Sequence, residues 1–492
     1  MTTITMSDTP KKTLDLLWSR VRQRGDLPGF SKVVAAILAA MRGEDDREFN
    51  MTRTVLSDPA LTQKVLRLAN SPMYAVFGGG INTVSKAVIV LGTEAIGHLA
   101  LGLKLIDGLQ GASAGSDVAR AEMEKAVLAG HIARQLAAAA SSRDAEEAVV
   151  CSMLHSLGRM MVTFYLPERW SAIKLRMAEG IDEAEAAREA LGMGLDEIGQ
   201  RIAQQWGLPN SLVASLQHMS PRTTAEPLDH TDWLAAISTM STCCAEVIHR
   251  DEPAAGGRDI ASIAGEYAEM LGIDVELVCS AVESARATAL EDSVISRPVK
   301  AAPGAGGKPA NAAAILTSGV TDMRSAFGNS STAQLLSMGL ETAYKGLGLT
   351  RAAAFLRNQD EARYAARMCL GDGVQELLPR LYFSDAYQPD VFHAALANDK
   401  MIFVENAREQ TFLNKLPRWW KEVFTTSASF IVLPLSVNRQ PIGFIYGDWD
   451  KNVAPARIEP GEVVPLNELR ALVVNAIENR RRMDGTLIRR IL

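Results

Sequence analysis

The chain has 492 residues, of which 47% are hydrophobic and 22% are charged. These proportions describe globular domains and exclude global disorder, a collagen-like chain and a membrane-embedded protein. The 51 Lys and Arg residues against 57 Asp and Glu residues give a net charge of −6, so no overall basic field attracts nucleic acid.

Cysteine usage and hydropathy indicate the compartment. The five cysteines are scattered along the chain and form no Cys-x-x-Cys pair, which argues against a disulfide framework and for a reducing environment. Residues 1–12 lack the apolar core of a secretory signal, and no run of 18 apolar residues occurs. We therefore expect a cytoplasmic protein without a membrane span.

A length of 492 residues predicts two or three domains. Residues 297–311 are rich in proline and glycine and contain nothing large to bury, which is typical of a flexible linker. The expected organisation is a tail over 1–13, a first domain over 14–290, a linker over 291–311, a second domain over 312–484 and a tail over 485–492.

The first domain shows helical periodicity throughout. Asp58-Pro59 is a helix start, with the carboxylate as N-cap and proline at the first helical position. The spacing of apolar residues then predicts helices over 84–106, 118–140, 146–164, 168–179, 182–190, 195–206, 209–217, 230–249, 259–271 and 274–289. No convincing strand alternation occurs, so this domain is expected to be all-α.

The periodicity changes after the linker. A helix over 330–347 precedes short strands, and a closing helix is expected over 465–482. The predicted strands cover 352–357, 364–370, 401–405, 430–435 and 442–449, the last two joined by a hairpin-like connection. Strands framed by helices predict an α+β domain with one antiparallel sheet.

Several spaced motifs of the first domain resemble the HDOD family, whose members are helical relatives of HD-type metal phosphohydrolases. The matching segments are Leu27-Pro28, 57–74, Ser85–Val88, 129–137, 153–162 and 204–212. The resemblance covers about residues 14–285. It implies a helical signalling module and a pocket in which an HD hydrolase would hold one or two metals.

Five positions of this chain correspond to that pocket. His131 and His155 match the first His and the HD His, and Ser156 stands where a hydrolase carries the Asp that bridges two metals. Glu197 stands where a third His is expected, and His218 is the one imidazole left of a His–His pair. A neutral hydroxyl does not bridge two dications well, so we expect no hydrolysis.

The last ligand of the hydrolase pattern is also missing. Its Asp would fall near Thr242, and Asp232 lies close in sequence but out of register. The favoured interpretation is a vestigial polar pocket with no metal, no cofactor and no catalytic residue, since a helix-buried His often only hydrogen-bonds a neighbour. Two alternatives stay open, namely a single weakly held metal and a divergent HD-type metal-dependent phosphohydrolase that acts on a nucleotide.

The second domain resembles the GAF family. The resemblance rests on residues 329–347 with the strand that follows, on 392–416, and on 430–450 with Leu433–Leu435 and Ile442-Gly443. It implies a sensory or dimerisation module. The Asn-Lys and Asp-Glu pattern of cyclic-nucleotide-binding members cannot be placed, so cyclic nucleotides are not implied, whereas another small-molecule ligand stays open.

Trp419 and Trp420 are candidates for interaction. One ring could line a ligand pocket or present an aromatic anchor to a partner. Adjacent helical positions cannot both face inward, so at least one is expected to be exposed or at an interface. The alternative is one core tryptophan and one surface tryptophan. The last predicted helix could pack on the sheet or extend into a homodimer seam.

Other catalytic motifs were not found. The chain has no Walker A loop, no dinucleotide-binding glycine fingerprint, no His-Glu-x-x-His and no Gly-x-Ser-x-Gly. The resemblances to the HDOD and GAF families imply a signal-transduction protein of bacterial type, and we expect it to be non-catalytic. Its expected partners are other signalling proteins, with a ligand at the GAF domain and a homodimer left open, and with no nucleic acid.

Overall fold

The chain folds into two compact units in the computed structural model. The first joins Met1–Asp45 to Glu94–Val299, and the second joins Asp46–Thr93 to Lys300–Leu492. The structure describes residues 10–24, 32–42, 46–70, 80–110, 117–137, 142–222, 227–249, 259–295, 307–371, 373–453 and 457–491. Each unit is taken by itself below.

The first unit is built of helices alone within its described residues, as the sequence predicts. The helices are α1 (Pro10–Arg24), α2 (Lys32–Arg42), α6 (Thr93–Gln110), α7 (Asp117–Ala137), α8 (Ser142–His155), α9 (Leu157–Tyr165), α10 (Pro167–Ala178), α11 (Glu183–Leu191), α12 (Leu195–Gln205), α13 (Asn210–Ala214), α14 (His230–Ile248), α15 (Ile260–Leu271) and α16 (Val275–Ile295). The helices α7, α8 and α14 pack against one another.

Carboxylate caps begin three of these helices. The side chains of Asp182, Asp229 and Asp259 accept backbone N–H groups from the first turns of α11, α14 and α15. These N–H groups have no partner within the helix, so an acidic residue at this position satisfies them and favours the helix start there.

Two predicted helices are each divided in the structure. The helix expected over 84–106 is α5 (Val84–Leu91) followed by α6, because Gly92 between them has φ +93°, which ends the helical path. The helix expected over 146–164 is α8 followed by α9, with Ser156 between them at φ −91° and ψ +20°. Both predictions of a single helix were wrong.

The second unit contains an α+β domain with one antiparallel sheet, which confirms that part of the predicted fold class. The strands are β1 (Arg351–Asn358), β2 (Arg363–Leu370), β3 (Tyr382–Ser384), β4 (Ile402–Val404), β5 (Ser427–Val437) and β6 (Gln440–Asp450). They lie in the order β3-β2-β1-β6-β5-β4. The connection between β5 and β6 is the expected hairpin, in which Asn438 and Arg439 take φ +51° and +63°.

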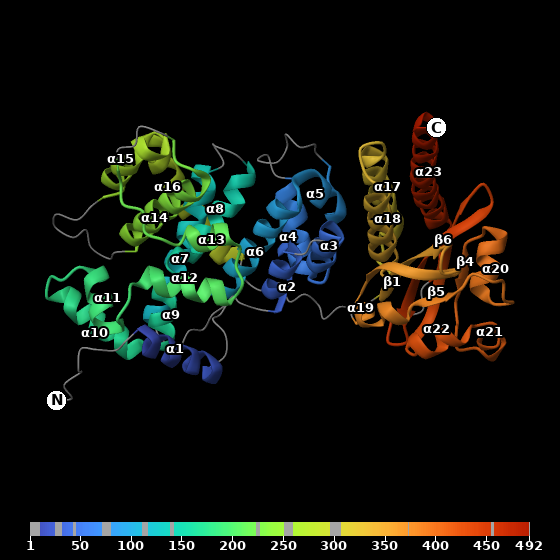
Figure 1. Ribbon diagram of the computed structural model, residues 1–492, viewed down its shortest axis with the longest axis horizontal. Coiled ribbons are helices and arrows are strands. Elements are labelled where there is room, and N and C mark those ends of the chain that lie inside the picture. The colour runs from blue at the N-terminus through green and yellow to red at the C-terminus, as the bar shows by residue number, and fades with distance from the viewer. Residues whose placement is uncertain are drawn as a thin grey trace. The chain divides into compact units, whose positions relative to one another are not determined.

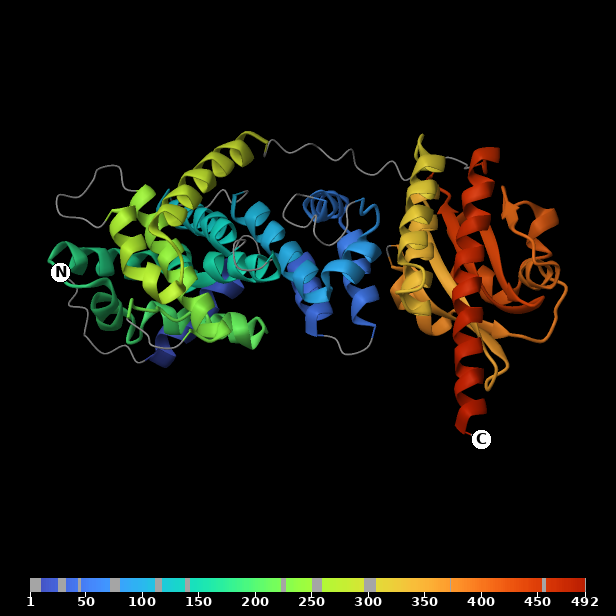
Figure 2. The ribbon, with the colours of Figure 1, turned by 90° about the horizontal axis from the view of Figure 1, so that it is seen from above.

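Helices cover both faces of this sheet (Figures 1 and 2). On one face, α17 (Ala312–Ala326), α18 (Thr332–Leu347) and α23 (Pro460–Ile491) share an apolar core with strand residues such as Leu433 and Trp449. On the other, α20 (Val391–Asn398) and α22 (Arg418–Val423) enclose an aromatic core, and α19 (Val374–Leu377) and α21 (Gln410–Leu413) complete the helices. The sequence analysis missed α17.

Three further helices belong to the second unit, although the sequence analysis assigned them to the first domain. They are α3 (Arg47–Leu56), α4 (Pro59–Ala69) and α5. They pack against one another, and α3 and α5 also contact α18. The division of the chain therefore differs from the predicted domains 14–290 and 312–484, because residues 46–93 group with the C-terminal part.

The predicted linker 291–311 lies partly outside the described residues, which omit 296–306. On its N-terminal side α16 continues to Ile295. On its C-terminal side Lys308 Nζ lies 2.6 Å from Glu462 Oε1, so residues from 307 on pack on the α+β domain rather than acting as linker. The described ends of the expected tails are helical too, since α1 begins at Pro10 and α23 ends at Ile491.

Within the described part of the chain, no single helix is both long and apolar enough to cross a membrane. Two bent pairs of helices meet the criterion only when their members are counted together.

Candidate functional site

Two histidines of the pocket predicted from the sequence lie on α7 and α8, which pack against each other. His131 lies on α7 and is 5% exposed. Its neighbour Gly130 faces α8 so closely that a Cβ there would lie 2.6 Å from Cγ of Met153. His155 is the last residue of α8 and is half-buried. The sequence folds this way locally because a glycine beside His131 lets the two helices approach.

The imidazole of His155 is engaged with α14. Its Nε2 lies 3.2 Å from Thr239 Oγ1. That hydroxyl donates to the Ala235 carbonyl oxygen at 2.7 Å and accepts the backbone N–H of Met219 at 3.1 Å. With its one proton directed at Ala235, the hydroxyl can only accept from the imidazole. This arrangement favours a proton on Nε2 of a neutral His155, and the lone pair of the ring is then on Nδ1.

Burial keeps the His155 imidazole neutral. Desolvation, followed by the charge of nearby His218, lowers its pKa to about 4; a hydrogen bond to the Ser215 backbone and, to a lesser extent, the charge of Asp196 oppose this shift. Sequence reasoning missed Asp196 and Thr239, although Asp196 is adjacent to Glu197 on the same helix turn.

The other residues predicted for the pocket are exposed or make local helix contacts. Glu197 is exposed on α12, and its Oε1 accepts the Gly194 backbone N–H at 3.4 Å, which caps the helix. His218 is also exposed. Ser156 lies at the break between α8 and α9, and its side chain makes no capping hydrogen bond to α9.

The positions suggested for the last hydrolase ligand do not supply a carboxylate to this pocket. Asp232 lies in the first turn of α14, where its carboxylate pairs with Arg222 at 3.2 Å. Thr242 Oγ1 is buried without a hydrogen-bond partner. Among the side chains that the structure describes, no group of three or more His, Cys, Asp or Glu could hold a metal ion. The residues present therefore do not fit a dinuclear centre.

A partly buried charge cluster surrounds Arg159 on α9. Arg159 contacts three carboxylates on three other helices, those of Glu122, Glu183 and Glu246. Burial opposes the charge of the guanidinium, but the carboxylates raise its pKa above the ordinary value. Burial also raises the pKa of Glu183, against the effect of Arg159. The cluster ties α7, α9, α11 and α14 together, and the sequence analysis did not single it out.

Both candidate tryptophans face the interior of the α+β domain. Trp420 is fully buried and donates its Nε1–H to Tyr446 Oη at 2.9 Å. Trp419 is half-buried and stacks on Phe383, with ring centroids 5.0 Å apart and planes inclined by 2°. The expectation that at least one of them is exposed or at an interface stays a prediction, because Trp419 is only half-buried. Both rings reach the same core from adjacent positions of α22, which is six residues long.

Aromatic rings fill this face of the sheet. Phe355 stacks on Phe444 at 4.5 Å, and Phe392 stacks on Phe430 at 5.8 Å. Tyr446 Oη in turn donates to Asp448 Oδ2 at 3.1 Å. Ring-to-ring contacts of this kind are those of a packed core.

A buried ion pair anchors the same face. Asp448 is fully buried and accepts two hydrogen bonds from Arg351, at 3.0 and 2.9 Å. Burial raises the pKa of Asp448, and the guanidinium beside it opposes that shift. This planar two-point contact joins β1 to β6 at the centre of the sheet.

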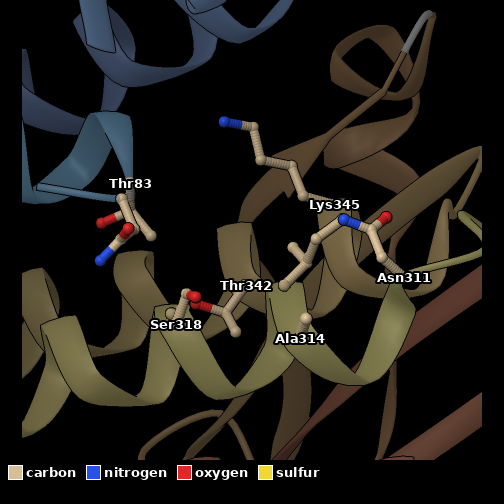
Figure 3. Close-up of a pocket in the computed structure, with 9 residues that line it drawn as sticks. Thr83, Asn311, Ala314, Ser318, Thr342 and Lys345 are labelled. Carbon is tan, nitrogen blue, oxygen red and sulfur yellow. The ribbon is translucent and has the colours of Figure 1, made fainter. Parts of the chain in front are cut away.

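A pocket of about 230 Å³ lies elsewhere in the second unit, between the start of α5 and the helices α17 and α18. Figure 3 shows Ala314 and Ser318 along α17, with Thr83 on the facing segment. The pocket is lined by Asn82, Thr83, Asn311, Ala314, Ile315, Ser318, Gly319, Thr342 and Lys345. None of its lining residues is one of the site residues predicted from the sequence.

Comparison with protein families identifies the helical region. Residues 27–221 match the model of the HDOD domain, so the chain contains an HDOD domain. A search of curated proteins found no match.

Solved structures were compared as well. An HDOD domain protein of unknown function from Geobacter sulfurreducens is 18% identical, covers 57% of this chain and 96% of its own, and has a TM-score of 0.40. A provisionally assigned phosphohydrolase from Shewanella amazonensis SB2B is 23% identical, with coverages of 56% and 96% and a TM-score of 0.39. The GAF domain of an Acinetobacter phosphoenolpyruvate–protein phosphotransferase is 15% identical, with coverages of 34% and 93% and a TM-score of 0.28.

Proposed function

We propose that this protein is a non-catalytic signal-transduction protein. Its HDOD domain acts as a regulatory output that binds other signalling proteins, and its C-terminal domain acts as a GAF-type sensory or dimerisation module. The observation that carries the proposal is the set of residues around His155. This central histidine is followed by Ser156 instead of a carboxylate, and among the described side chains no three or more His, Cys, Asp or Glu are grouped so that they could hold a metal ion.

The remaining pocket residues support the same proposal. A hydrolase needs several neutral imidazoles and a bridging anion around one point. Here Glu197 caps a helix and His218 is exposed. Because Glu197 caps a helix and His218 is exposed, we assign the helical scaffold the role of a binding surface for other proteins.

Metal analysis together with a hydrolysis assay tests the proposal. The purified full chain is analysed for bound metals by mass spectrometry, and turnover of bis(4-nitrophenyl) phosphate is measured with Mn²⁺ or Mg²⁺. We expect less than one metal per chain and no turnover. Two tightly bound metals, or turnover that His155→Ala abolishes and the exposed control His249→Ala retains, would instead establish a metal-dependent phosphohydrolase.

The C-terminal module is proposed to work through protein contacts more than through a ligand in its aromatic face. The close stacking of Phe355, Phe444, Phe383 and Trp419 supports this, since the rings fill the space that a small molecule would need. A thermal-shift screen of cyclic nucleotides and common metabolites tests it on the full chain. We expect no stabilisation, whereas a ligand at 100 times its Kd would stabilise the domain by about 2.7 kcal/mol.

A further inference from the structure

The start of α5 is capped by two carboxylates from the C-terminal domain. Asp322 on α17 and Glu341 on α18 are both fully buried. Asp322 Oδ2 accepts the backbone N–H groups of Asn82 and Thr83, each at 2.8 Å. Glu341 accepts those of Val84 and Ser85, each at 2.8 Å. Four consecutive backbone N–H groups at the start of α5 are thus hydrogen-bonded to carboxylates of the C-terminal domain.

Side chains complete these contacts. Thr83 Oγ1 donates to Asp322 at 3.0 Å, and Ser85 Oγ donates to Glu341 at 2.6 Å. Lys86 lies 3.3 Å from Asp322, and on the other side Lys345 lies 3.3 Å from Glu341. Two buried carboxylates therefore meet two ammonium groups and the positive end of a helix, which offsets the cost of burying them.

Apolar and polar contacts of α3 extend the same surface. Phe49 is 7% exposed and belongs to the core that α17, α18 and α23 form on the sheet. Leu56 and Ile89 pack against that core. Beside them, Gln334 Nε2 donates to both carboxylate oxygens of Glu48, at 3.1 and 2.8 Å. We call the whole contact of α3 and α5 with α17 and α18 the α5 joint.

The α5 joint combines two features that a chance contact lacks. Its carboxylates are fully buried, and a buried carboxylate without partners is strongly destabilising. Apart from Lys345, their partners lie 236–257 residues away in the chain. These partners are four backbone N–H groups at the start of α5 and the side chains of residues 82, 83, 85 and 86. The geometry therefore requires α5 to begin where it does.

We propose that the surface of α17 and α18 is the docking site of α3–α5 of the same chain, and that these three helices move with the C-terminal domain. This inference extends the proposed function and rests on it, because it names the route by which the C-terminal domain would regulate the HDOD domain. A change in the C-terminal domain would reach the HDOD domain by displacing helices that belong to the HDOD match. The chain leaves the α5 joint at Gly92, whose φ of +93° separates α5 from α6.

A disulfide trap tests the docking in the full chain. Ser85 Oγ and Ser337 Oγ lie 3.2 Å apart across the α5 joint, so the pair S85C and S337C is within reach of a disulfide. After mild oxidation, we expect peptide mapping to find the 85–337 crosslink within single chains and to lose it on reduction. The single variants S85C and S337C serve as controls and should give no such crosslink.

The crosslink experiment has two outcomes that contradict the proposal. A crosslink found only between two chains would mean that a second copy occupies the surface. Absence of the crosslink in the folded double variant would mean that the helices do not dock there. Neither result would change the outcome of the metal and turnover assays. Conversely, bound metals or turnover would overturn the proposed function without contradicting the docking of α3–α5 on α17 and α18.

Removing a cap provides a second, independent measurement. Asp322→Ala deletes the acceptor of the backbone N–H groups of Asn82 and Thr83, which immediately precede α5. We expect hydrogen exchange of the peptide over residues 82–88 to become about tenfold faster. Asp322→Asn keeps an acceptor and should give a smaller increase. The control is Glu468→Ala, which removes the partner of Arg324 on the same helix α17. Unchanged exchange over 82–88 in folded Asp322→Ala would overturn the proposal.

Discussion

At the scale of single residues, the neighbours of His155 determine how its imidazole is held. The Thr239 hydroxyl donates to a carbonyl of its own helix, so it is placed to accept a hydrogen bond from the imidazole. The burial that lowers the His155 pKa to about 4 would permit metal binding, since a metal needs neutral imidazole. Our proposal of a non-catalytic pocket therefore rests on the missing carboxylate beside His155 and not on the charge of the imidazole.

The depressed pKa of His155 predicts a specific pH dependence. An unfolded histidine titrates near 6.5, whereas the folded one takes up its proton only near 4. The unfolded state therefore binds more protons between these values, and stability should fall as the pH is lowered from 6.5 to 4, by at most about 3 kcal/mol from this residue. His155→Gln should flatten the dependence measured by urea unfolding.

The control for this measurement is His249→Gln, because His249 is exposed at the end of α14. It should leave the pH dependence of the wild-type chain unchanged. A His155→Gln variant that retains the full loss of stability between pH 6.5 and pH 4 would contradict the assignment of that loss to His155.

At the scale of elements, close helix contacts determine how the first unit is built. The break at Ser156 lets α9 run against α12, where Gly158 is so close that a Cβ on it would lie 1.8 Å from the Leu195 carbonyl oxygen. Gly158→Ala should therefore destabilise the first unit by roughly 1–3 kcal/mol, because the two backbones must separate. Chemical denaturation followed by circular dichroism measures the change.

Gly265 provides the matched control for this variant. It also lies within a helix, α15, and a Cβ there would meet no atom within 4 Å. Gly265→Ala should stabilise the chain by about 0.5–1 kcal/mol through the better helix propensity of alanine. Equal effects of the two substitutions would show that the approach of α9 to α12 is looser than described.

Local patterns predicted the elements whose cause is local. Apolar periodicity located α7, α12 and α14, and the alternation around Asn438 indicated the β5–β6 hairpin. The breaks at Gly92 and Ser156 were missed because a short interruption does not disturb an apolar stripe. The pairing of Trp419 and Trp420 in one core was missed because the length of α22 is set by the loops around it.

Candidate site residues were predictable only as positions in a motif. The motif located His131 and His155, but it could not show that Thr239 contacts His155. The contacts of Asp322 and Glu341 with residues 82–86 had no signal in the sequence, since these partners lie more than 230 residues away and include backbone N–H groups, which carry no sequence pattern.

At the scale of the whole molecule, the boundary between units does not follow the boundary between families. The HDOD match covers 27–221, yet residues 46–93 group with the α+β domain. Cooperative units of a protein follow contacts rather than sequence order. The stability of α3–α5 should therefore depend on the sheet of the C-terminal domain.

A substitution in that sheet tests this dependence. Arg351→Met leaves the fully buried carboxylate of Asp448 without its partner, which should destabilise the second unit by about 3–5 kcal/mol. Native-state hydrogen exchange should then become faster in α4 and α5 together with β1 and β6, while α7 and α14 keep their protection. The exposed pair of Arg418 with Glu422 gives the control, and Arg418→Met should change nothing measurable.

Gly158→Ala supplies the reciprocal measurement, since it should accelerate exchange in α7, α9 and α12 and leave α4 and α5 protected. If the exchange protection of α5 falls in Gly158→Ala but not in Arg351→Met, residues 46–93 belong to the first cooperative unit. The two variants destabilise different units by known contacts, so the exchange of α5 reports which unit holds it. Because the hydrogen bonds of Asp322 and Glu341 are to α5 itself, we expect it to follow Arg351→Met.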